Sequence, residues 1–265
     1  MSEFTAKDVQ ALRQATGAGM MDAKRALTEA DGDAEAAAKW LREKGLAKAA
    51  SRSDRENTQG AVAVATAGTD VVAVVELKCE TDFSAKAEDF TAAVQTLADA
   101  VAADGEEAVT KRADLVENLN ITKKENIEVG RVARVEAASG NVLDTYLHRQ
   151  EGRGVNAVVV ELAGGSPELA HDLAVHIAFT KPTYRDRDEV PADLVAEERT
   201  TLEGTTRAER KPEAAMAKIV EGRLGGWYKE RVLLDQAFVR DEKQTVAQML
   251  GDATLVRFVQ VVIGS

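Results

Sequence analysis

The sequence predicts an α+β protein with a three-helix module at the N-terminus, two related α+β subdomains and a protruding helical hairpin. Three observations predict it: a helix-rich beginning, a strand-strand-helix order that occurs twice, and a long, charged helical stretch near the C-terminal end. The resulting division is 1–50 for the module, 51–60 for a linker, 61–139 for the first subdomain, 140–265 for the second, and about 188–228 for the hairpin.

The first 50 residues carry the signals of three short helices. Ser2 or Thr5 is suited to cap the first helix, and the glycines of Thr16 to Gly19 stop it. We expect the second helix from about Met21 to Ala30 and the third from Ala34 to Lys44, with Gly45 as its end. The order of these helices resembles the ubiquitin-associated type of three-helix module.

Two copies of one pattern follow the polar linker. β-rich runs at 61–66 and 71–77 precede an amphipathic helix at 85–103, and runs at 142–148 and 155–162 precede another at 169–179. The runs Val72 to Leu77 and Ala157 to Leu162 match at an offset of 85 residues, and both end in Glu-Leu. This similarity predicts two related subdomains, and we assign strands at 131–137 and 254–263 to the second.

The stretch from about Asp188 to Tyr228 is helical and heavily charged. Apolar residues on its two arms can face each other across a turn that contains Gly204 and Lys211-Pro212. This pattern predicts an antiparallel helical hairpin that projects from the body of the protein.

Composition excludes several classes of protein. Lys and Arg total 34 against 45 acidic residues, and a net charge of −11 disfavours nucleic acid as a partner. Cys79 is the single cysteine, which excludes an internal disulfide. The sequence has no apolar run of the ~20 residues that span a bilayer and no signal-peptide pattern, so we expect a cytoplasmic protein without a membrane partner.

The residue types that carry chemistry do not form a catalytic or metal-binding pattern. His171 and His176 are five residues apart and fall on divergent helix faces, and His148 stands alone near a strand end. Cys79 has no neighbouring histidine to activate it, and Gly17-Ala18-Gly19 lacks the remaining residues of a phosphate-binding loop. We therefore predict no catalytic residue, no cofactor, no metal and no small-molecule substrate.

Two segments stand out as motifs. Leu12 to Leu27 reads LRQATGAGMMDAKRAL, and Glu76 to Lys86 reads ELKCETDFSAK. Both resemble signatures of the elongation factor Ts family, in the family's order, and the similarity continues through Ile127 to Val132, Lys181-Pro182 and Lys218 to Arg223. Lys78 and Ser84 depart from the family's usual Asn and Val.

The resemblance implies a guanine nucleotide exchange factor that binds the GTPase elongation factor Tu during protein biosynthesis. The partner-binding residues that it implies are Thr81, Asp82 and Phe83 for nucleotide exchange, Met20 and Met21 for docking, and His148 for a further contact. The Thr81 to Phe83 turn would enter the GTPase near its Mg²⁺ and β-phosphate site.

Structural alternatives stay open for several of these residues. Phe83 could instead be buried under its own helix, Met20 and Met21 could pack between the three helices, and Asp82 could be only the N-cap of the following helix. Two other classes of function also remain: a pure adaptor, or an enzyme whose cleft the sequence does not display.

Overall fold

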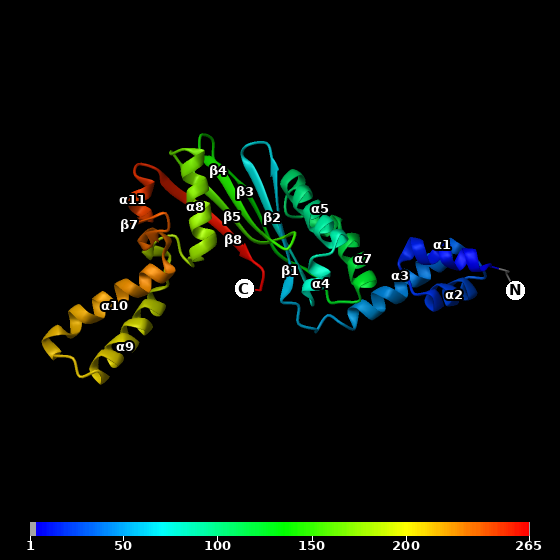
Figure 1. The fold of residues 1–265 in the computed structure, drawn as a ribbon, viewed down its shortest axis with the longest axis horizontal. Helices are drawn as coiled ribbons and strands as arrows, with labels where there is room; N and C mark the ends of the chain where they lie inside the picture. Colours follow the sequence, from blue (N-terminus) through cyan, green and yellow to red (C-terminus); the bar gives the residue numbers. More distant parts are fainter. Residues whose placement is uncertain (1–3, 265) are drawn as a thin grey trace.

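The computed structural model describes residues 4–264 and shows an elongated molecule (Figure 1). A helical module lies at one end, two β-sheets with their helices form the centre, and a helical hairpin extends from the other end. The predicted α+β class is confirmed. Ser2, one of the two caps expected for the first helix, lies outside the described residues.

The N-terminal module contains α1 (Ala6–Thr16), α2 (Met20–Glu29) and α3 (Ala34–Ala50). The Thr5 side chain caps α1 by accepting a hydrogen bond from the Asp8 N–H, and Gly17 ends it with a φ of 67°. The helices pack around a small core: Val9, Leu12, Ala23, Ala26, Leu27, Ala37 and Leu41. The expected end of the third helix at Gly45 is wrong, because α3 continues to Ala50 and packs on α7.

The first sheet has the order β1-β2-β3, and all its strands are antiparallel. It comprises β1 (Gln59–Ala67), β2 (Val71–Cys79) and β3 (Glu128–Glu136). Four helices lie between β2 and β3 in the chain: α4 (Asp82–Ala85), α5 (Glu88–Asp104), α6 (Ala108–Lys111) and α7 (Ala113–Lys123). Helix α5 covers one face, with Phe90 and Leu97 fully buried. Our assignment of the 131–137 strand to the second sheet is wrong, because β3 pairs with β2.

The second sheet has the order β4-β5-β8 and is also antiparallel. It comprises β4 (Val142–Gln150), β5 (Arg153–Ala163) and β8 (Thr254–Val262), and α8 (Pro167–Thr180) covers its outer face. A small two-stranded sheet of β6 (Ala237–Phe238) and β7 (Asp241–Thr245) and the short α11 (Val246–Leu250) precede β8. The prediction that the final strand completes this sheet is confirmed.

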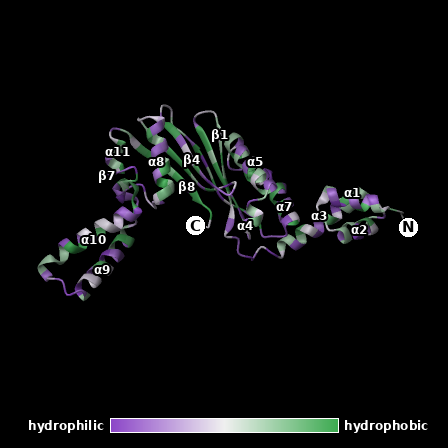
Figure 2. Ribbon diagram, in the orientation of Figure 1, coloured by the Kyte–Doolittle hydropathy of each residue, from purple (hydrophilic) through white to green (hydrophobic). Residues whose placement is uncertain are grey.

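The two sheets pack face to face, so α5 and α8 lie on opposite outer faces. Valines and alanines fill the interface: Val62, Val72, Val74, Val135, Ala157, Val159 and Val261. At Gly154 the strands approach so closely that a Cβ would lie 2.2 Å from the Val62 carbonyl oxygen. Figure 2 shows the corresponding hydrophobic colouring along the strands at the centre of the molecule.

The hairpin consists of α9 (Ala192–Ala208) and α10 (Met216–Arg231), joined through the short 3₁₀ helix Glu213–Ala215. Two further 3₁₀ helices, Arg187–Glu189 and Leu233–Asp235, flank it. Gly204 lies within α9 rather than in the turn that we expected there. The base of the hairpin is held by an apolar cluster of Val190, Leu224, Trp227 and Val232, while ion pairs such as Arg199–Glu221 join its arms.

Candidate partner-binding surface

The turn after β2 presents a large aromatic side chain to solvent. Thr81 is the N-cap of α4, and its hydroxyl accepts a hydrogen bond from the Ser84 N–H at 3.2 Å. Phe83 is 83% exposed, whereas Ser84 and Ala85 are buried. Burial of Phe83 under its own helix is therefore excluded, and Asp82 is the first residue of the helix rather than its cap.

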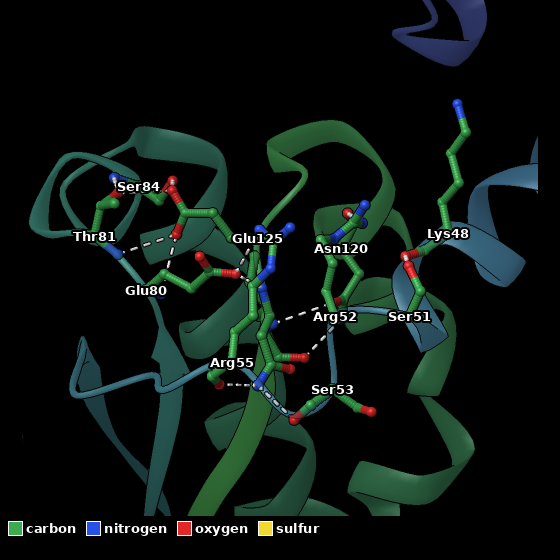
Figure 3. Close-up of polar contacts among 12 residues, drawn as sticks. Lys48, Ser51, Arg52, Ser53, Arg55, Glu80, Thr81, Ser84, Asn120 and Glu125 are labelled. Atoms are coloured by element: carbon green, nitrogen blue, oxygen red, sulfur yellow. Dashed lines mark hydrogen bonds and ion pairs between the residues drawn. The ribbon is translucent and has the colours of Figure 1, made fainter.

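The turn is held in place by a carboxylate that lies far away in the sequence. Glu125, just after α7, accepts hydrogen bonds from the backbone N–H groups of Glu80 and Thr81 and from the hydroxyls of Thr81 and Ser84. Figure 3 shows Thr81 and Ser84 directed toward Glu125. Sequence reasoning missed Glu125, because no local pattern indicates that it faces a turn some 40 residues earlier.

An ion-pair chain connects this turn to the second subdomain. The Lys86 ammonium pairs with Asp82 at 2.7 Å and also with Glu151, in the turn between β4 and β5. The hydrogen bond from Lys86 lowers the pKa of Asp82, and the same bond raises the pKa of Lys86 with help from Glu151. Asp82 is therefore ionised at neutral pH and adds a negative charge beside the exposed ring.

His148 lies near the end of β4, three residues before Glu151, and its side chain is exposed. Its Nδ1 is 3.4 Å from the Tyr146 hydroxyl, and the two rings are stacked. The Lys86–Glu151 contact thus brings the strand end that carries His148 toward the Phe83 turn. The His148 ring itself stacks on Tyr146, which also contacts His171 of α8, so it lies on the α8 side of β4.

The other two histidines have structural roles. His171 is 2.9 Å from the Asp144 carboxylate on the protein surface. His176 is fully buried between Gln236 and the N–H of Val239. Burial lowers the pKa of His176, and the hydrogen bond with Gln236 offsets only part of this effect. His176 is therefore neutral at physiological pH.

Met20 and Met21 lie at the start of α2, on the N-terminal module. Their exposed fractions are 50% and 74%, so neither is packed in the three-helix core. Next to them, a cleft of about 840 Å³ is lined by residues of the module and of the end of α7, beside the contact between α3 and α7. Asp22 is the one acidic residue in the lining of this cleft. Its basic lining residues are Lys39, Arg42, Lys44, Lys48, Arg52 and Lys124.

The chemistry of the remaining candidates does not favour catalysis. The Cys79 thiol is buried beneath the turn, and its S–H donates to the Thr81 carbonyl. Burial, together with the charge of Glu125, raises the pKa of Cys79 to about 12, so the thiol is protonated and unreactive.

Among residues 4–264, no group of three His, Cys, Asp or Glu side chains is arranged to hold a metal ion. No helix within the same residues is long and apolar enough to cross a membrane.

Comparison with known proteins gives a consistent result. Residues 80–265 match the family model described as elongation factor TS. The chain is 45% identical to elongation factor Ts of Arthrobacter sp. (strain FB24) and 46% identical to that of Renibacterium salmoninarum; each alignment covers 96% of this chain and 95% of the relative. It is 44% identical to elongation factor Ts of Acidothermus cellulolyticus, over 100% of this chain and 99% of the relative.

The matched proteins are all translation elongation factors. Since identities of this size extend over nearly the whole chain, the chain belongs to the elongation factor Ts family.

Proposed function

We propose that this chain is a guanine nucleotide exchange factor that binds elongation factor Tu in its GDP form and promotes release of GDP. Family membership supports this role, and the observation that carries it is the exposure of Phe83 on a firmly held turn. A large apolar side chain that the protein keeps in water at 83% exposure is suited to insertion into a partner.

In this proposal the protein performs no covalent chemistry. Asp82 and Phe83 enter the GTPase near the site that holds Mg²⁺ and the β-phosphate, and the displaced elements lose their hold on the metal and on GDP. Reciprocity of binding free energies then requires that bound GDP weakens the partner's affinity for this factor by the same ratio. GTP rebinds to the emptied GTPase and releases the factor.

Phe83 alone supplies too little free energy for this task. Burial of one Phe contributes roughly 1.5–3 kcal/mol, whereas nanomolar binding of a nucleotide corresponds to about 12 kcal/mol. A broad interface must supply the remainder. We assign Met20 and Met21 to docking of the N-terminal module, and the exposed His148 to a contact of the second subdomain.

The basic cleft beside Met20 and Met21 supports docking onto an acidic surface of the partner. It gathers six Lys and Arg side chains in a chain whose net charge is −11. Ion pairs within the protein already engage part of this charge, since Arg42 pairs with Glu117 at 2.9 Å. Steering by exposed charges is screened beyond about 8 Å at physiological salt, so association should slow as ionic strength rises.

The test is the release of labelled GDP from purified elongation factor Tu, with and without the full chain, at low and at high salt. Acceleration by catalytic amounts of the chain supports the proposal. Binding without acceleration would instead indicate an adaptor. Failure to bind the GTPase at either salt concentration would refute the proposal.

A further inference from the structure

The four-residue helix α4 cannot hold its own conformation. A single helical turn in water is unstable, because nucleation fixes several residues for very few hydrogen bonds. Phe83 contributes little burial to stabilise it, because the ring is 83% exposed. The conformation that presents Phe83 must therefore be fixed by groups outside α4.

Glu125 supplies those contacts. Its Oε2 accepts hydrogen bonds from the N–H groups of Glu80 and Thr81, both at 3.1 Å. Its Oε1 accepts from the Thr81 hydroxyl at 2.7 Å and from the Ser84 hydroxyl at 2.6 Å. These four donors match the four lone-pair sites of a carboxylate. They lie on both sides of Asp82 and Phe83, so one side chain brackets the turn.

Glu125 is itself rigidly placed. Lys124 adopts a left-handed conformation with a φ of 61°, which ends α7 and directs the chain toward the end of β2. The buried Asn126 is fixed by hydrogen bonds from its Nδ2 to the carbonyl oxygens of Ser53 and Arg55, and from its N–H to the Glu80 carboxylate. Figure 3 shows Arg55 of the linker next to Glu80 and Glu125.

We propose that Glu125 is a positioning residue for nucleotide exchange, which fixes the turn so that Phe83 meets the partner already in its binding conformation. The inference rests on the exchange function proposed above. A turn ordered before binding avoids the conformational entropy cost of ordering it in the complex. Glu125 acts through Phe83 and does not itself enter the partner.

The experiment uses the full chain with Glu125→Ala, Glu125→Gln, Phe83→Ala and the Glu125→Ala/Phe83→Ala double variant, with Glu128→Gln as a nearby exposed control. The rate of GDP release is measured as a function of factor concentration. We expect Glu125→Ala to lower the rate roughly tenfold, and Glu125→Gln to recover most of it. The Gln carbonyl can still accept from the two N–H groups, while its NH₂ can donate to the two hydroxyls. Glu128→Gln should match the wild type.

The double variant distinguishes positioning from general support of the fold. If Glu125 acts through Phe83, the double variant is no slower than Phe83→Ala alone. Multiplied effects, or a folded Glu125→Ala variant with the wild-type rate, would overturn the proposal. Should Glu125→Ala fail to fold, Ser84→Ala removes one of the four donors and must produce a smaller loss in the same direction.

A measurement without the partner separates this inference from the proposed function. Amide hydrogen exchange at 82–85 in the free chain should be faster in Glu125→Ala than in the wild type, while the strands of the first sheet stay protected. Unchanged protection at 82–85 would overturn the positioning role. If the wild-type chain does not accelerate GDP release from elongation factor Tu, the exchange function is overturned instead.

Discussion

Glu76 and Glu161 occupy corresponding positions on the central strands of the two sheets, and both are buried. Glu76 accepts a hydrogen bond from the Arg131 N–H at 2.9 Å, and Glu161 accepts from the Ala138 N–H at 2.9 Å and from Arg257 Nε at 2.7 Å. Each carboxylate thereby ties the central strand to a neighbouring segment of chain. The two Glu-Leu pairs of the sequence repeat thus share one structural role: each glutamate is a buried hydrogen-bond acceptor on a central strand.

Glu161 should make the stability of the protein depend on pH in the acid range. Burial acts to raise its pKa, but hydrogen bonds from Asn141, Ala138 and Arg257 outweigh this effect and lower the pKa below its ordinary value of 4.5. The unfolded chain therefore takes up this proton at higher pH than the folded chain. The stabilisation is complete above about pH 4.5 and is lost as the pH falls through the lower, folded-state value.

Glu161→Gln should therefore lower the free energy of unfolding at pH 7 by about 1–3 kcal/mol and reduce its slope with pH below about 4.5. Urea unfolding at several pH values measures both effects, and the exposed Glu197→Gln is the control. An unchanged acid slope in Glu161→Gln would show that other carboxylates dominate it.

Phe83→Ala should slow stimulated release of GDP by about ten- to a hundredfold, the rate equivalent of losing roughly 1.5–3 kcal/mol of burial. Its thermal melting should stay close to that of the wild type, because the ring is exposed in the free protein. Phe179→Ala is the matched control, since Phe179 is 78% exposed on α8. Equal rates for Phe83→Ala and the wild type would remove Phe83 from the mechanism.

Shortening the hairpin should leave exchange within a few-fold of the wild type. The apolar cluster around Val190 and Trp227 forms the base of the hairpin, so the shortened variant should keep this cluster. Arg199 and Glu221 pair across the two arms, and a short glycine-containing turn in place of 200–220 can therefore join them. Complete loss of GDP release, in a variant that melts normally, would identify the hairpin as part of the interface.

Gly45→Ala should loosen the contact between α3 and α7. A Cβ at this position would lie 2.8 Å from Ile121 Cγ1, and Ile is stiff at χ1. We expect this overpacking, at about 1–3 kcal/mol, to exceed the gain of about 1 kcal/mol that Ala brings to a helix. Hydrogen exchange in α7 should therefore become faster, and Ile121→Ala in the same chain should reverse this.

Gly222→Ala is the control for helix propensity, because nothing lies within 4 Å of its Cβ position in α10. It should raise the free energy of unfolding by up to about 1 kcal/mol. If Gly45→Ala were equally stabilising, the close packing of α3 on α7 would not restrict that position.

The sequence was informative where a pattern is local. Alternating and continuous runs of valine predicted the strands, and a Phe between Asp82 and Ser84 predicted an exposed ring. The duplicated order of strands and helix also predicted the two sheets. For the strands and for the exposed ring, the residues that determine the structure are neighbours in the sequence.

Features that depend on distant contacts were not predictable in this way. The pairing of β3 with β2 depends on tertiary contacts between distant strands. Chain order alone suggested that β3 belongs to the second sheet, which is wrong. Gly45 and Gly204 resemble helix ends, yet both lie inside helices, and Gly45 is placed against Ile121. Glu125 has no local signal, because its four donors come from residues 80–84.

The position of β8 has a consequence for how the chain is made. The first sheet is built from residues 59–136, so all its strands are available while the remainder of the chain is still being synthesised. The second sheet needs β8, at Thr254–Val262, and Val261 also belongs to the layer between the sheets. The β4-β5 hairpin, which carries Ala157 and Val159, can therefore cover the valine face of the first sheet early, and Val261 of β8 joins this layer last.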